Sequence, residues 1–304
     1  MDIRNVQKTG NMHYVYLPTA WCKKHKLTSK NKVSTTLNED GTLTLSPELR
    51  EGKKKGFVLH VKEDNLDVLH KLIIASYLTP AAHFKIILDK HIDYTKLLHQ
   101  KKLISLELVE INKDSITCEG SIVIEDLGSL LKTMLRKIRN MLVVLMKNYN
   151  KELVSRYEEE IDRSQLLLDK SIIEAFTFHH SSQLRTIELH YISLMSKELE
   201  RLVDILSVME NLDTSFLKSV LDVVDLLKDL LENIGTDSFS LSPHEALVFI
   251  KKVEQVESVK VKDIATYEKK RAKELLVTLS EILIDWALYY ELENASLPKK
   301  EVLS

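Results

Sequence analysis

Glycine and proline are scarce in this chain, which contains seven glycines and five prolines among 304 residues. This scarcity argues against a mainly β protein, because sheets joined by tight turns need both residues, and it favours long helices. It also argues against a glycine-rich phosphate-binding loop. The patterns GxxxxGKS/T, GxGxxG, GxSxG and HExxH are all missing, so no common nucleotide, hydrolase or zinc-protease motif is present.

Cysteines and long apolar runs are few as well. Cys22 and Cys118 are the only cysteines, which excludes a disulfide framework and a CxxC metal motif. The longest purely apolar run, residues 141–146, is far shorter than the roughly 20 residues of a membrane span. The first ten residues have no apolar signal core. The sequence therefore predicts a soluble, cytoplasmic protein without membrane insertion.

What the chain does contain is an ordinary globular composition, 44% hydrophobic and 29% charged, with a net charge of −2 that is unevenly distributed. Residues 1–60 carry eleven basic and five acidic side chains, whereas the remainder carries 32 basic and 40 acidic ones. A basic N-terminal segment thus precedes an acidic body.

Three segments with different secondary-structure patterns follow one another and predict an α+β, mainly helical fold. Over 1–50 we expect a small β-rich domain with a hairpin turn at Asp40-Gly41 and a short helix over 20–27 capped by Thr19. Over 56–125 strands and helices alternate, which predicts an α/β linker or sensing domain. The expected elements of these two parts are strands at 2–8, 13–18, 32–37, 41–46, 57–61, 84–88, 104–111 and 116–124, and helices at 64–78 and 93–102.

Residues 126–293 have helical periodicity almost throughout and predict two three-helix bundles. The expected helices are 126–150, 151–176, 183–211, 214–233, 243–257 and 260–292. In the third helix we expect an apolar stripe of Leu184, Ile187, Tyr191, Leu194, Leu202, Ile205 and Met209. Glu198 lies within this stripe, so we expect it to pair with a basic or hydroxyl side chain across the bundle.

Acidic pairs four residues apart occur on two of these helices. Glu158 and Asp162 share one line of the second helix with Asp169, and Glu200 and Asp204 lie on the third. Counting at about 100° per residue places Glu200 and Asp204 opposite the apolar stripe, pointing outward. On neighbouring helices the pairs would supply oxygen ligands to a hard cation. Two alternatives for these acidic pairs stay open. They form a solvated helix face, or they belong to a metal-dependent hydrolase.

The basic segment is typical of a nucleic-acid partner, because residues 1–36 contain seven basic side chains and one acidic one. The order RNVQKTG, YVYLPTAWCKKHKL, KVSTTL, EDGTLTLSP resembles the AbrB/SpoVT swapped-hairpin DNA-binding domain, although Asn11 and Met12 replace its usual extra glycine. That resemblance implies a homodimer. We expect Trp21, on a short helix between strands, to be a core or dimer anchor rather than a base-stacking platform. The expected DNA-binding residues are Arg4, Lys8, Thr9, Asn11, His13, Lys23 and Lys24.

The helical body resembles a second family. EEEIDR and KELERLVD are similar to the two motifs of the PhoU phosphate-uptake regulators, with Val203 and Ile205 departing from the usual pattern. The resemblance implies a divalent or trivalent metal ion. Its ligands would be Glu158, Asp162, Glu200 and Asp204. In the second trio Leu276 and Ser280 occupy the acidic positions, so only one metal cluster is expected. His179 and His180 precede the third helix and could join its shell.

Together these patterns predict a DNA-binding transcriptional regulator of phosphate homeostasis that is not an enzyme and has no catalytic residues. The partners expected are double-stranded DNA, a second copy of the chain, and a phosphate transporter or sensor kinase. The alternative is a PhoU-like adaptor that regulates such a transporter or kinase by protein contact, with the N-terminal domain serving only to dimerise.

Overall fold

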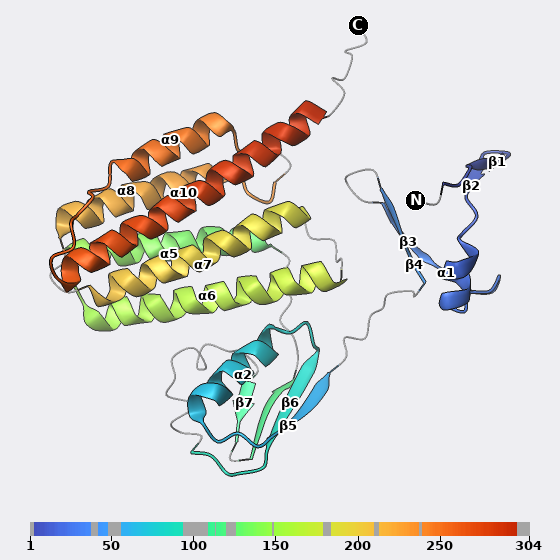
Figure 1. Cartoon of the computed structure of the whole chain (residues 1–304), viewed down its shortest axis with the longest axis horizontal. Helices are drawn as coiled ribbons and strands as arrows, with labels where there is room; N and C mark the ends of the chain where they lie inside the picture. Colours follow the sequence, from blue (N-terminus) through green and yellow to red (C-terminus); the bar gives the residue numbers. More distant parts are fainter. Residues whose placement is uncertain are drawn as a thin grey trace, which may run out of the picture. The chain divides into compact units, whose positions relative to one another are not determined.

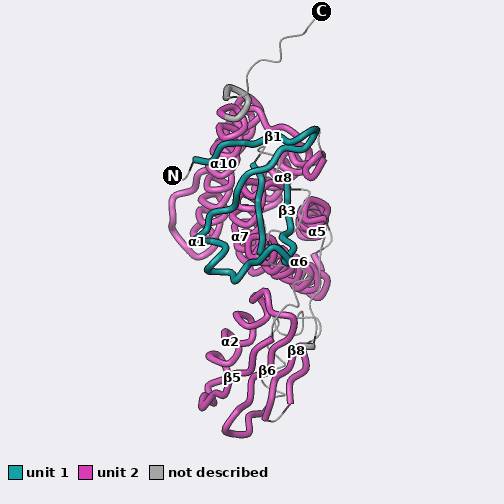
Figure 2. The backbone as a smooth tube through the Cα atoms, turned by 90° about the vertical axis from the view of Figure 1, so that its right-hand side faces the viewer, with its two compact units in different colours: residues 1–54 teal, residues 55–304 magenta. Residues whose placement is uncertain are grey.

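The structure is a computed structural model. It describes residues 3–37, 42–47, 56–93, 109–112, 114–119, 126–147, 149–178, 184–209, 213–236 and 239–296. The chain forms two compact units, Met1–Lys54 and Lys55–Ser304, which Figure 2 distinguishes by colour. No helix among these residues is long and apolar enough to cross a membrane.

The first unit consists of two antiparallel hairpins and one short helix. Its elements are β1 (Gln7–Thr9), β2 (Met12–Tyr14), α1 (Thr19–Lys24), β3 (Ser34–Leu37) and β4 (Leu43–Ser46). Gly10 has a φ of 60°, which closes the tight turn between β1 and β2 without steric cost. The predicted Asp40-Gly41 turn lies outside the described residues, although the strands on either side of it are paired as expected.

Two details of this unit differ from the sequence prediction. Thr19 is the first residue of α1 rather than its cap, because Pro18 takes the cap position and no side chain caps the helix. The helix ends at Lys24, and Lys26 adopts a positive φ of 53° that is incompatible with continuing it to residue 27.

The second unit begins with a small α/β part. Its elements are β5 (Phe57–Val61), α2 (Leu66–Leu78), β6 (His83–Leu88), β7 (Val109–Ile111) and β8 (Ser115–Glu119). The strand order is β5-β6-β8-β7, with β5 and β6 parallel and the other pairs antiparallel. Helix α2 packs on one face of this sheet (Figure 1), where Leu69 and Ile73 meet Phe84, Ile86 and Ile116. Of the helix expected at 93–102, residues 94–102 lie outside the described residues.

Six long helices make up the rest of the second unit, so the chain is α+β and mainly helical as predicted. They are α5 (Leu127–Lys147), α6 (Lys151–Phe178), α7 (Thr186–Val208), α8 (Thr214–Leu230), α9 (Pro243–Glu254) and α10 (Ile264–Ser296). Side-chain caps fix the first residues of two of these helices, α8 and α9. Asp213 accepts hydrogen bonds from the amides of Ser215 and Phe216, and Ser242 and Glu245 form a capping box.

These helices pack as a ring in the order α5, α6, α7, α10, α9, α8. The trio α5–α7 and the trio α8–α10 lie beside each other (Figure 1), but one continuous hydrophobic core contains residues of all six helices. In the second trio, α8 packs on α5 and α9, and α10 packs on α7 and α9. The trios are thus two halves of a single packed body.

The buried face of α7 differs from the predicted stripe. Leu194 is 37% exposed, whereas Ile192, Met195, Leu199 and Leu206 are fully buried. Most of the predicted stripe does belong to the core: Leu184 and Leu202 are buried, and Tyr191, Ile205 and Met209 pack against it. The stripe was wrong at Leu194 and incomplete, because α7 packs against both α6 and α10 and a single apolar line does not describe its buried surface.

Glu198 pairs with a basic side chain, as expected, but that side chain lies on the same helix instead of across the bundle. Its Oε1 accepts from Nη1 of Arg201 at 2.8 Å, one turn along the same helix. The ion pair therefore lies on α7 itself and does not cross the bundle.

Helix α6 also holds the α/β part of the same unit. The buried Lys170 Nζ donates to the carbonyl oxygens of Tyr77 at 2.7 Å and Thr79 at 3.3 Å. These carbonyls lie at the C-terminal end of α2, where the helix dipole favours a cation. Leu166, one turn earlier on α6, is buried in the core of the α/β part. The sequence prediction missed this contact, because Lys170 stands between Asp169 and Ser171 and looks like an ordinary polar position of the helix.

Candidate metal centre and candidate nucleic-acid interface

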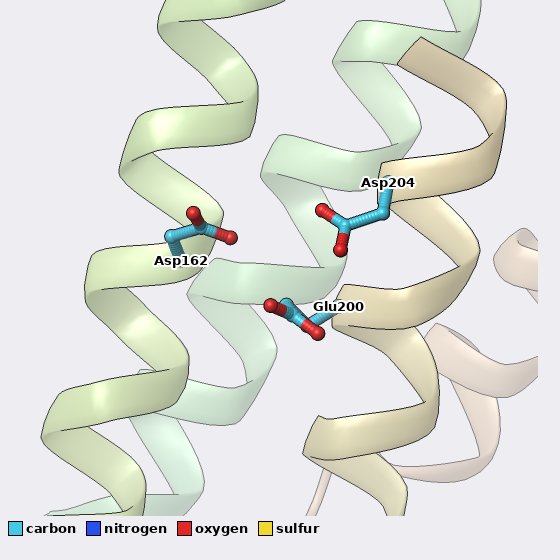
Figure 3. A group of neighbouring side chains, drawn as sticks. All are labelled: Asp162, Glu200 and Asp204. Atoms are coloured by element: carbon cyan, nitrogen blue, oxygen red, sulfur yellow. The ribbon is translucent and has the colours of Figure 1, made fainter. Parts of the chain in front are cut away.

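Three of the four predicted metal ligands come together between α6 and α7. One carboxylate oxygen each of Asp162, Glu200 and Asp204 lies within 4.8 Å of the others. Figure 3 shows Asp162 on α6 facing the two acids of α7. Glu200 and Asp204 are one turn apart, so they point to the same side of α7, and α6 packs against that side.

Two of these carboxylates are buried, which the sequence did not predict for Glu200. Asp162 is 4% exposed and Glu200 is 9% exposed, while Asp204 remains open to solvent. Glu200 was expected to point outward because it lies away from the apolar stripe. It is buried because α6 covers that face of α7, and a helical wheel of α7 alone contains no information about this neighbour.

Glu158 and Asp169 extend the acidic line of α6 but are not part of the group. Glu158 is half-buried one turn before Asp162 and lies outside the three-carboxylate cluster. Asp169 makes a separate polar contact with α7. It accepts from Gln165 at 2.7 Å and from Ser193 at 3.3 Å, and Lys197 Nζ lies 3.8 Å away. Burial raises the pKa of Asp169 above its usual range, and Lys197 opposes that shift.

The cluster offers a hard donor set made of oxygen alone. Such ligands suit divalent or trivalent cations that prefer carboxylates and water. Its open side, at Asp204, would leave room for water or for a further ligand. At the matching positions of the second trio, Leu276 and Ser280 are buried core residues. Among the described residues this is the single group of three such side chains, and whether it binds a metal stays a prediction.

The predicted DNA-binding residues lie on three segments of the first unit. Lys8 and His13 are directly cross-strand in the first hairpin, and Thr9 and Asn11 lie at its turn. Thr9 Oγ1 is 3.3 Å from the hydroxyl of Tyr14, which ties the two strands together. The remaining predicted residues lie elsewhere: Arg4 before β1, and Lys23 and Lys24 in the last turn of α1. All seven side chains are exposed.

The first unit buries none of its described residues. Ile3 is 82% exposed and Leu37 is 77% exposed, and several more large apolar side chains are open: Val6, Met12, Tyr14, Val15, Tyr16 and Leu43. Trp21 is half-buried, with its ring 5.4 Å from that of His25. A chain segment that exposes this much apolar surface lacks a core of its own.

His179 and His180 lie outside the described residues.

Comparisons with protein-family models, with curated proteins and with solved structures found no match for this chain. The two family resemblances therefore rest on the motifs quoted above.

Proposed function

We propose that this protein is a DNA-binding transcriptional regulator, in which the first unit dimerises and binds duplex DNA and the helical body modulates it. The observation that carries the proposal is the combination found in the first unit: its apolar side chains are unburied, and its surface is basic. The first property calls for a second protein surface, and the second calls for a polyanion.

A second copy of the same unit is the simplest cover for the exposed apolar side chains. Short hairpins leave unpaired strand edges and bury little surface alone, and pairing two copies removes both costs. Pairing also doubles the basic surface. Two related hairpins then present Lys8 and His13 twice, as two-fold DNA-binding proteins do on a duplex.

The helical body fits a sensing role. Its cluster of Asp162, Glu200 and Asp204 would bind a divalent or trivalent cation, and its PhoU-like motifs favour a signal connected with phosphate uptake. Linkage supplies the mechanism: a cation or partner that binds one state of the body more tightly changes the affinity of the dimer for DNA. DNA then changes the affinity of the body for that cation or partner by the same factor.

The decisive experiment measures DNA binding by the full chain as a function of salt. Wild-type protein should bind duplex DNA with an affinity that falls steeply with salt. The double substitution Arg4→Ala and Lys8→Ala should weaken binding and flatten the logarithmic salt slope by about one unit for each phosphate that the variant no longer neutralises.

A matched control removes two exposed lysines of the α/β part, Lys71→Ala and Lys85→Ala, which lower the total charge equally. The control should bind DNA like the wild type. Equal binding by all three proteins would overturn the assignment of this surface to DNA. No salt-dependent binding by the wild type would leave the non-DNA-binding adaptor as the better interpretation.

A further inference from the structure

One end of the helical body collects three connections between helices. The α5–α6, α7–α8 and α9–α10 connections all lie at the end on the left of Figure 1, and we call the described residues of 147–153, 208–213 and 255–267 the turn end. Lys269, in the first turns of α10, forms an ion pair at 2.6 Å with Asp213, the cap of α8. This contact fixes two of the three connections against each other.

Exposed apolar side chains concentrate at the turn end. Of twelve large apolar side chains that are exposed in the described part of 126–296, six lie here: Tyr149, Leu153, Val208, Val261, Ile264 and Tyr267. Ile264 is 76% exposed, the highest value among the large apolar side chains in the described part of 126–296. Ile264 and Tyr267 are three residues apart and lie on one side of the first turn of α10, and Val261 lies in the segment that leads into it. This is more than the scattered apolar exposure of an ordinary surface.

These side chains are presented by an ordered segment. Asp263 Oδ1 accepts from the amide of Thr266 at 2.8 Å, and Thr266 Oγ1 accepts from the amide of Lys262 at 2.9 Å. The α10 start is therefore capped on both sides of Ile264. Its apolar side chains are held out by a formed structure, so binding there requires little additional ordering.

Basic residues are interleaved with the apolar ones. Residues 257–271 carry five basic and three acidic side chains, in a body that carries 22 basic and 29 acidic ones over 126–296. Lys260 and Lys262 flank Val261, and Arg271 lies one turn beyond Tyr267. These three cations are exposed and form no ion pair with any described residue. Apolar side chains framed by cations are typical of segments that lie at the surface of an anionic bilayer.

We propose that the turn end docks on an anionic lipid surface, with Val261, Ile264 and Tyr267 entering the headgroup region and Lys260, Lys262 and Arg271 contacting lipid phosphates. A second copy is a poorer occupant, because it would bring these unpaired cations together. A shaped protein pocket is also a poorer fit, because the apolar tips arise from separate connections at one end, and a deformable surface accommodates them together. The proposal holds whether or not the first unit binds DNA.

Vesicle co-sedimentation of the full chain tests the binding. Wild-type protein should sediment with vesicles of phosphatidylcholine mixed with phosphatidylglycerol and remain in solution with phosphatidylcholine alone. The substitutions Ile264→Ser and Tyr267→Ser should weaken partition about ten-fold, since each removes exposed apolar surface that would be buried in lipid. The matched control, Leu288→Ser with Leu292→Ser, changes two exposed apolar residues near the opposite end of the same helix and should sediment like the wild type.

A second measurement separates insertion from simple attraction of the basic first unit to anionic vesicles. Tryptophan is introduced as Ile264→Trp or, for control, as Leu288→Trp, lipids with brominated acyl chains are used as quenchers, and the quenching of the wild type, which contains Trp21 and Trp286, is subtracted. Quenching at 264 but not at 288 supports docking through the turn end. Equal quenching at both positions, or none, overturns the proposal. So does a wild-type oligomer that Ile264→Ser dissociates without any vesicle binding, because the surface would then be an interface between copies.

Discussion

Asp162 and Glu200 are carboxylates placed where solvent scarcely reaches them, one on each of two packed helices. Two negative charges held this close in a region of low exposure repel each other, and water screens them poorly. Asp204 adds a third carboxylate on the open side. A cation would relieve this repulsion and would stabilise the native state through binding.

The cluster should therefore respond to metal. Added divalent or trivalent cations should raise the melting temperature of the wild type, and replacing Glu200 and Asp204 by Ala should abolish both the rise and any bound metal. The measurement is a thermal-shift titration combined with elemental analysis. A matched control removes Glu281 and Asp285, an exposed acidic pair with the same spacing on α10, and should leave the response intact. A solvated-face interpretation predicts no response in any of the three proteins.

Asp213 is a second residue whose charge has a readable effect. The hydrogen bond from Lys269, followed by the amides of the first turn of α8, holds the pKa of Asp213 below its ordinary value of 3.8. A lowered carboxyl pKa contributes stability above the ordinary value, and that contribution is lost as the pH falls through the folded-state pKa.

Asp213→Ala should therefore lower the free energy of unfolding by about 1 kcal/mol at pH 7, since it removes both a cap and a partly exposed ion pair. The difference from wild type should shrink toward pH 3. Urea unfolding at the two pH values measures it. Asp213→Asn retains a capping side chain and should lose less than the alanine variant. A difference that does not change with pH would contradict this account.

At the scale of single elements, α6 is the helix with the most varied surroundings. It packs on α5 and α7 through its apolar residues, contributes Asp162 to the acidic cluster, and holds α2 through Lys170. Leu166 lies one turn from Asp162 and is buried in the core of the α/β part. The acidic cluster and the α/β part therefore share a rigid element.

Lys170→Met should loosen the contact between α2 and α6. It leaves the carbonyl oxygens of Tyr77 and Thr79 without their buried donor, at a cost of roughly 1–3 kcal/mol. Hydrogen exchange at the C-terminal end of α2 and in β6 should accelerate. Lys132→Met is the control, because Lys132 donates to a single backbone carbonyl, that of Glu232, at an exposed site. Equal effects of the two substitutions would show that burial of Lys170 does not matter.

The elements themselves were largely predictable, and their neighbours were not. All six long helices follow from periodicity and from the scarcity of glycine and proline, which are local properties. The partners of Lys170 lie 93 and 91 residues earlier in the chain, and no local pattern connects them. The exposure of Leu194 and the burial of Glu200 likewise depend on which helices pack against α7. Spacing placed Glu158 with Asp162 on one face of α6 and Glu200 with Asp204 on one face of α7, and the resemblance to the PhoU motifs joined the two pairs. Glu158 lies outside the group that the structure forms.

At the scale of the whole molecule, the chain combines a unit that has no core with a unit that has two. The α/β part and the six helices each have a hydrophobic core, whereas the first unit has none among its described residues. The stability of the second unit is therefore expected to be independent of the first.

Removing residues 1–54 tests this division. The remaining protein should keep its helical circular dichroism and its melting temperature, because none of its core side chains comes from the first unit. It should also be a monomer by light scattering if the first unit alone supplies the dimer contacts. A truncated protein that stays dimeric would locate those contacts in the second unit, and an unfolded one would show that the division at residue 54 is wrong.

The absence of buried side chains among the described residues of the first unit also affects how the protein responds to its own abundance. On the proposed function, a segment that folds only as a pair reaches its DNA-competent form in proportion to the square of the monomer concentration while monomers prevail. Halving the rate of synthesis then leaves about a quarter of the paired first units. A change in gene copy number, or dilution by growth, would thus change operator occupancy by a larger factor than it changes the protein concentration. The regulator would respond to its own dosage in addition to any bound effector.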